Sequence, residues 1–212
     1  HGGPFGLFPL GSWETLSFPA ERYRSRHVVF LVRDIRDVLV SFYFEATKRS
    51  ALFEGSLPDF LRDPALGARK VVAYYNWWYE HRSVPVEFLL LRYADIHRDP
   101  AAELRRVLDV LGASVDDQAV ADAVAFGRFD TMRSVEAESQ DARLAASRPG
   151  DPESRKVRRG EVGGYTEYLS GDDLAYVDEV VATMGLPGCD WYFEQDRPTR
   201  GSPGGGPTPG PR

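Results

Sequence analysis

An arginine and a serine eight residues apart, Arg33 and Ser41, have the side-chain types and the spacing that suit an anion site. A guanidinium group offers a planar fork of donors that matches a phosphate, and a hydroxyl adds one directional hydrogen bond. The alternative is a surface arginine paired with Asp34 or Asp37, together with a serine that faces solvent. The segment alone leaves both interpretations open.

The residues around this pair predict a strand followed by a helix. Residues 28–32 are a short apolar run rich in valine, which is typical of a strand covered on both faces, and Arg33 falls at its carboxyl end. The residues from position 34 or 35 to about position 49 carry apolar side chains at helical spacing, so Ser41 falls within the helix. Open α/β sheets bind ligands at the carboxyl ends of their strands, which is where this arginine lies.

The rest of the chain continues the alternation of strand and helix. The apolar residues 86–91 predict a second strand. Start and stop signals predict a short helix beginning near residue 56, a helix between Asp99-Pro100 and Gly112, and others at 68–82, 114–126 and 170–185. Two strand-then-helix units with a helix between them predict an α/β fold in which helices flank a parallel sheet.

The predicted helix at 68–82 is unusually rich in aromatic residues, namely Tyr74, Tyr75, Trp77, Trp78 and Tyr79. Such a density is typical of a helix that packs in a core and leaves a partly exposed rim. The alternative is that these rings line the pocket of an acceptor molecule. The sequence leaves both interpretations open.

Residues 33–43 resemble the 3′-phosphate-binding region of sulfotransferases that use 3′-phosphoadenosine 5′-phosphosulfate (PAPS). That region has an arginine, an acidic or amide residue, two variable positions, Asp-Val, two further positions, and a serine before aromatic residues; this chain has Arg-Asp-Ile-Arg-Asp-Val-Leu-Val-Ser-Phe-Tyr. Three later segments resemble other parts of the family in the correct order: 91–95 its Tyr-Glu-Asp strand end, 126–132 the segment over the adenine, and 157–165 its late Arg-Lys-Gly loop. On these four matches the chain is identified as a member of the family.

This resemblance implies a P-loop NTPase-like sulfotransferase architecture and a set of ligand-binding residues. The residues that would hold the 3′-phosphate are Arg33, Ser41, Arg158, Arg159 and Gly160, and those that would contact the adenine are Tyr93 and Phe129. The glycine would let its backbone amide approach a phosphate oxygen. A solvated basic loop is the alternative for Arg158 and Arg159, because other charged residues surround them. The family has a lysine where this chain has Arg159, and a tryptophan where it has Tyr165.

The family's catalytic base is a histidine at the end of a strand that precedes the arginine strand, and His1 matches it in order. An imidazole can take the proton from an acceptor hydroxyl. The alternative for His1 is a frayed chain end or the remnant of a tag. The family also has a first strand and a Pro-Lys-Ser-Gly-Thr loop that grips the 5′-phosphosulfate, and residues 1–11 lack the lysine and hydroxyls of such a loop. We therefore expect an N-terminally truncated domain.

Composition limits the class of protein. A chain of 212 residues that is 42% hydrophobic supports one domain with a substantial core, which we place at 1–195, and the Gly/Pro-rich residues 196–212 predict a disordered tail. A net charge of −6 argues against nucleic acid or an anionic membrane as partner. The single Cys189 excludes an internal disulfide and fits a cytoplasmic location, and no apolar run has the length of a membrane span.

The resemblance implies transfer of a sulfuryl group from PAPS to a hydroxyl of an alcohol, phenol or sugar, without a metal. The partner would then be a small-molecule or glycan acceptor. The alternative is a catalytically incompetent fragment or remnant that binds only the 3′-phosphoadenosine moiety. A P-loop kinase or NTPase is disfavoured, because the sequence has no Gly-Lys-Ser/Thr loop and no metal-binding acid after a strand. The sequence leaves the acceptor and the oligomeric state open.

Overall fold

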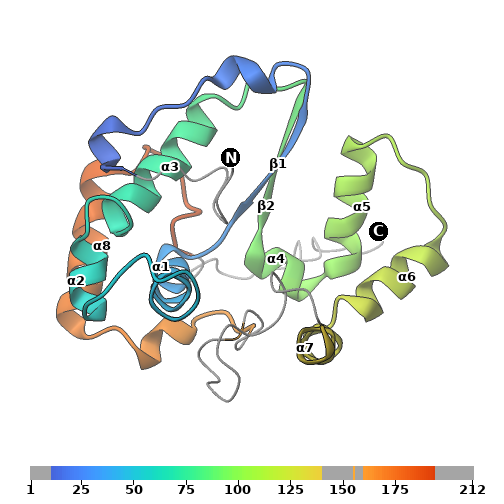
Figure 1. Ribbon diagram of the computed structural model, residues 1–212. Coiled ribbons are helices and arrows are strands. Elements are labelled where there is room, and N and C mark those ends of the chain that lie inside the picture. The colour runs from blue at the N-terminus through green and yellow to red at the C-terminus, as the bar shows by residue number, and fades with distance from the viewer. Residues whose placement is uncertain (1–10, 140–154, 156–159, 194–212) are drawn as a thin grey trace, which may run out of the picture.

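The computed structural model describes residues 11–139, 155 and 160–193 of the chain. Within these residues the sheet is formed by two strands, β1 (His27–Val32) and β2 (Glu87–Arg92), which run parallel and lie side by side (Figure 1). Their register begins with His27 opposite Glu87 and ends with Val32 opposite Arg92. Both strands match the predicted apolar runs to within about one residue at each end, which is the usual uncertainty of such boundaries. The parallel pairing confirms the predicted α/β fold.

Helices lie on both sides of the two strands (Figure 1). One group consists of α1 (Ile35–Phe44), α2 (Leu57–Arg62), α3 (Ala68–Glu80) and α8 (Gly171–Met184). The other consists of α5 (Pro100–Val110), α6 (Asp117–Phe126) and α7 (Phe129–Glu138). No helix in the described part of the chain combines the length and the apolar character that crossing a membrane requires.

The face of the sheet toward α3 is the better covered one. Phe30 and Val32 of β1 are buried, and the Phe30 ring centroid lies 5.6 Å from that of Tyr75 in α3. Alternate residues of a strand point to opposite faces. Val29 and Leu31, on the other face, are 41% and 49% exposed. Within the described residues, the prediction of a strand covered on both faces is therefore wrong for the second face of β1.

The aromatic side chains of α3 belong to the core. The buried ones are Tyr75, Trp77 and Trp78, and the half-buried ones are Tyr74 and Tyr79. This distribution confirms the interpretation of a core helix with a partly exposed rim. Tyr75 in addition lines a pocket beyond the carboxyl end of β1, so one ring of the set has a place at a site as well.

Side-chain caps fix where several helices begin. Ser56 and Ser170 form capping boxes at α2 and α8, and the Asp99 side chain accepts a hydrogen bond from the Ala102 amide at the start of α5. These starts confirm the predicted ones, because an unpaired amide in a first helical turn is readily satisfied by such side chains. At α6 the cap is Asp116 instead of the predicted Ser114.

Two further predictions are corrected by the structure. The helix after β1 ends as an α-helix at Phe44 and continues as one π-helical turn, η3 (Glu45–Arg49), so its last turn holds an extra residue. Residues 91–95 resemble a strand end of the family, but β2 ends at Arg92, and Tyr93 begins a short helix, α4 (Tyr93–Arg98). No glycine or proline interrupts residues 93–98, so nothing in the backbone opposes a helix there.

Candidate anion-binding site

Arg33 is the first residue after β1 and is fixed at both its backbone and its side chain. The Tyr75 hydroxyl lies 3.3 Å from both its amide nitrogen and its carbonyl oxygen. Its guanidinium Nη2 lies 3.1 Å from Asp37 Oδ2 and donates to the Glu161 carbonyl at 2.6 Å. The same guanidinium stacks over the Tyr93 ring, 4.4 Å from its centroid. A flexible side chain is thereby held in one place at the carboxyl end of the sheet.

Three of the predicted site residues line one pocket of about 500 Å³. These are Arg33, Ser41 and Tyr93, and the remaining wall is formed by Leu31, Val38, Phe42, Glu45 and Tyr75. Ser41 is exposed in α1, which begins at Ile35, two residues after Arg33, and both residues line the pocket. The structure therefore brings this arginine and this serine together at one pocket, and their use as an anion site stays a prediction.

The alternative interpretation of Arg33 as an ion-paired residue is confirmed at the same time. Asp37 is only 3% exposed and stands one helical turn after Arg33, where its carboxylate faces the guanidinium. The pair does not use all the donors of Arg33. Its Nε is buried and has no hydrogen-bond partner among the described residues. A buried donor without a partner is costly, so an anion that accepts from this nitrogen fits the site.

The segment that contains Gly160 reaches the same place from the far end of the sequence. Gly160 has a φ of +68°, and a Cβ at this position would lie 2.6 Å from Cδ2 of Phe129. Glu161, the next residue, supplies the carbonyl that Arg33 contacts. Gly160 and Phe129 are thus brought together beside Arg33, and a glycine is required by both the backbone conformation and the approach of the ring.

Tyr165, which stands where the family has a tryptophan, is buried, and its ring is covered by the side chain of Arg36. The Arg36 guanidinium stacks 4.2 Å from its ring centroid and also contacts Asp34 at 2.9 and 2.6 Å. Burial opposes the charge of Arg36, but the hydrogen bond to Asp34 and its charge outweigh burial and raise the pKa of Arg36. Burial also raises the pKa of the Tyr165 phenol. The contact between Arg36 and Tyr165 therefore attaches this part of the loop to α1.

Three predicted residues, His1, Arg158 and Arg159, lie outside the described residues. The described geometry consequently concerns residues predicted to contact the phosphate and the adenine, and it does not include the predicted catalytic base, His1. Sequence reasoning named Asp37 as a possible partner of Arg33, but it missed the contacts of this carboxylate with the distant loop. It also missed the contacts of Arg33 with the Tyr75 hydroxyl and the Glu161 carbonyl. These are long-range contacts with no local pattern.

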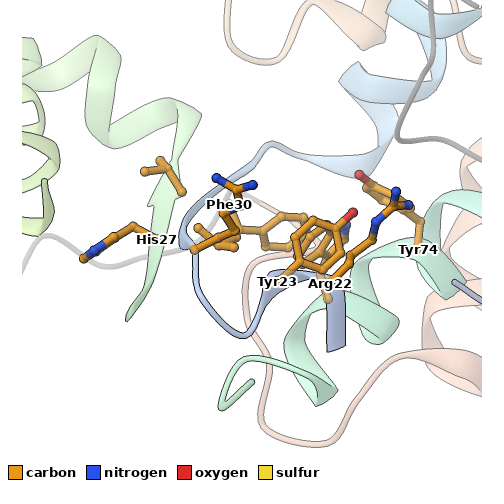
Figure 2. Close-up of a pocket in the computed structure, with 9 residues that line it drawn as sticks. Arg22, Tyr23, His27, Phe30 and Tyr74 are labelled. Carbon is orange, nitrogen blue, oxygen red and sulfur yellow. The ribbon is translucent and has the colours of Figure 1, made fainter. Parts of the chain in front are cut away.

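A second pocket, of about 540 Å³, lies near the other end of β1. Figure 2 shows Arg22, Tyr23 and Tyr74 gathered at one end of it and His27, the first residue of β1, at the other. Of the residues predicted to bind the phosphate or the adenine, those that the structure describes do not line this pocket. The candidate site is therefore the pocket that follows β1.

Gly160 allows a test of the glycine requirement by stability. We expect Gly160→Ala to destabilise the chain by more than Gly112→Ala, which has a φ of +65° but no atom within 4 Å of the added Cβ. Both substitutions incur about 1–2 kcal/mol for a left-handed backbone. Only the first also displaces Phe129. Urea unfolding of the two variants measures the difference, and equal midpoints would contradict a close contact between Gly160 and Phe129.

Comparison with known proteins shows a family and a fold. The family model described as "Sulfotransferase domain" matches residues 19–186. Bovine sulfotransferase 1E1 is 23% identical over 79% of this chain and 54% of its own length, and mouse sulfotransferase 1A1 is 25% identical over 78% and 57%. The chain therefore spans a little over half the length of these curated relatives.

Solved structures share the fold. A mouse sulfotransferase in complex with PAP superposes with a TM-score of 0.64 at 21% identity, covering 84% of this chain and 65% of the other. Retinol dehydratase in complex with androsterone and the inactive cofactor PAP gives a TM-score of 0.62 at 18% identity, covering 82% and 51%. At these identities the superpositions concern the arrangement of the elements and leave the function of the pocket to be argued from its own residues.

Proposed function

The chain belongs to the sulfotransferase domain family, and from this premise we propose that it binds PAPS in the pocket after β1. The reaction would transfer the sulfuryl group to a hydroxyl of an alcohol, phenol or sugar. The single observation that carries the proposal is that Arg33, Ser41 and Tyr93 line one pocket. Gly160 and Phe129 meet beside it, since the neighbouring Glu161 carbonyl contacts Arg33.

Each of these residues has a proposed role at the donor. The Arg33 guanidinium and the Ser41 hydroxyl would donate to the 3′-phosphate, with the buried Nε of Arg33 as one of the donors. Tyr93, whose ring already lies against that guanidinium, and Phe129 would contact the adenine. Binding energy from this end of the donor would orient its other end for reaction.

The transfer itself would break one bond and form one. The acceptor oxygen would attack the sulfur of PAPS, and the S–O bond to the 5′-phosphate would break, leaving adenosine 3′,5′-bisphosphate. The acceptor proton would pass to a base, for which His1 remains the proposal. We propose no metal, because a sulfuryl group carries less charge than a phosphoryl group. A relative from Arabidopsis thaliana, 22% identical over 73% of this chain and 49% of its own length, is named cytosolic sulfotransferase 16, and this likeness and the single cysteine support a cytoplasmic location.

The proposal predicts selective binding of a nucleotide with a 3′-phosphate. We expect adenosine 3′,5′-bisphosphate to bind at least about tenfold more tightly than AMP, which lacks that group, since a charge-assisted hydrogen bond contributes about 1.5–3 kcal/mol. Isothermal titration calorimetry with both nucleotides, and with ADP, measures the selectivity. Equal affinity for all three nucleotides would contradict a 3′-phosphate site.

A transfer assay separates the enzyme from a binding remnant. Labelled PAPS is supplied with three acceptors, a phenol, a sterol alcohol and a sugar, and the labelled product is counted. Transfer to any of them supports catalysis by this chain. Selective bisphosphate binding without transfer would favour the alternative, a module that only holds the 3′-phosphoadenosine moiety.

A further inference from the structure

Asp37 is the side chain that connects the two parts of the candidate site. Its Oδ2 accepts a hydrogen bond from the Gly163 amide at 2.8 Å and lies 3.1 Å from Nη2 of Arg33, and its Oδ1 accepts from the Tyr165 amide at 2.9 Å. These residues come from the strand end, from α1 and from a loop 126 to 128 positions further along the sequence. One carboxylate therefore joins three segments.

The environment of this carboxylate explains why it can be buried. A buried charge is tolerated when it is paired and its lone pairs are occupied, and Asp37 has a cation on one side and two backbone amides on the other. Gly163 has a φ of +81°, and this left-handed residue lets the amides of Gly163 and Tyr165 converge on one group. The loop is shaped around the carboxylate.

The same contacts constrain the residue that would bind the phosphate. Nη2 of Arg33 lies between Asp37 Oδ2 and the Glu161 carbonyl, and this carbonyl belongs to the loop that Asp37 anchors. Arg33 and the loop are thus linked twice, once directly and once through Asp37. A change at Asp37 would remove the second link and leave the hydrogen bond from Arg33 to the Glu161 carbonyl as the remaining one.

We propose that Asp37 is a positioning residue, which assembles the anion site by holding the Arg33 side chain and the segment Gly160–Tyr165 in one arrangement before a ligand binds. The identity of the ligand in this inference rests on the proposed function. The anchoring of the loop does not, because it concerns contacts within the chain alone.

The test combines hydrogen exchange with nucleotide binding in Asp37→Ala and Asp37→Asn. An asparagine keeps one acceptor oxygen but places a donor where the other stood, so both variants lose contacts with Arg33 or the loop. We expect faster exchange at the amides of Gly163 and Tyr165 without ligand. We also expect adenosine 3′,5′-bisphosphate to bind at least about tenfold more weakly, with a much smaller change for AMP, so that the selectivity for the 3′-phosphate falls.

Asp173→Asn is the matched control. Asp173 is a buried carboxylate at the start of α8 that accepts from Ser170 and lies 3.5 Å from Arg62, and among the described residues its polar contacts are with these two and not with the pocket residues. This variant measures the effect of losing a buried carboxylate away from the candidate site. We expect it to lower the unfolding midpoint and to leave the selectivity for adenosine 3′,5′-bisphosphate over AMP unchanged.

Gly163→Ala tests the same contact from the loop side if the Asp37 variants do not fold. A side chain is strained at the left-handed φ of Gly163, so the amides would turn away from the intact Asp37. We expect the same loss of selectivity.

Two results would overturn the inference: unchanged exchange at Gly163 and Tyr165 in a folded Asp37 variant, or faster exchange there with unchanged selectivity. If the unmodified chain binds no adenosine 3′,5′-bisphosphate, the proposed function fails, and the exchange measurement alone still decides whether Asp37 anchors the loop.

Discussion

Replacing Arg33 by alanine is expected to weaken the binding of adenosine 3′,5′-bisphosphate by about 100-fold, the largest functional effect of any substitution considered at this site. The substitution removes the charged donors of the pocket, including the buried Nε. It also leaves the carboxylate of Asp37 buried without its cation, which adds to the cost of assembling the site. Isothermal titration calorimetry of the variant measures the loss.

The specificity of this loss is as informative as its size. AMP lacks the 3′-phosphate, so its affinity is expected to change much less than that of the bisphosphate. Arg33→Lys keeps the charge but not the planar fork, and we expect an intermediate loss of about tenfold. Arg24→Ala, which removes an exposed arginine paired with Glu21, is the matched control and is expected to have no effect. An equal loss for both nucleotides would indicate general damage to the fold.

Local sequence patterns predicted the strands and most helix starts because short-range physics determines them. Apolar runs of β-branched residues favour buried strands, and Ser56, Asp99 and Ser170 each satisfy amides within their own helical turn. Such contacts span three residues or fewer, so they are visible in the sequence. The α/β arrangement follows from their order along the chain.

The predictions that were wrong or incomplete concern features without a local sequence signal. The helix α4 has six residues, too few for a helical period to be visible, and its first residue packs its ring against Arg33. The π-helical turn Glu45–Arg49 contains neither glycine nor proline, so no local signal marks the change from the α-helix. The exposure of Val29 and Leu31 is a property of what covers the sheet and not of the strand itself.

The same division between local and long-range contacts applies to the candidate site. Arg33 and Ser41 were predictable because they lie eight residues apart on one continuous segment that leads from the end of β1 into α1. The resemblance added Tyr93, Phe129 and Gly160, which the structure brings beside them. What joins these segments, a buried carboxylate that binds amides more than 120 residues away, leaves no periodic trace in the sequence. Long-range polar contacts of this kind become visible only in the folded chain.

The largest expected effect on stability belongs to Phe60→Ala. Phe60 is fully buried in α2, and three rings surround it edge to face, those of Phe42, Tyr43 and Phe53, with centroids 5.5, 5.6 and 5.2 Å away. Truncation removes these contacts and leaves a cavity, which costs about 3–5 kcal/mol of unfolding free energy. We expect a fall of about 10 °C or more in the thermal midpoint, measured by circular dichroism.

Phe126→Ala provides the matched control for this prediction, since the same side chain is 59% exposed at the end of α6 and should change the unfolding free energy by less than about 1 kcal/mol. Phe60→Leu keeps an apolar group in the cavity and is expected to lie between the two. Equal shifts for Phe60→Ala and Phe126→Ala would contradict a core at α2.

Because Phe42 packs on Phe60 and also lines the pocket, the Phe60→Ala cavity is expected to loosen one wall of the site as well. A weaker affinity for adenosine 3′,5′-bisphosphate in the folded fraction of this variant would show that the core beneath α1 supports the geometry of the anion site.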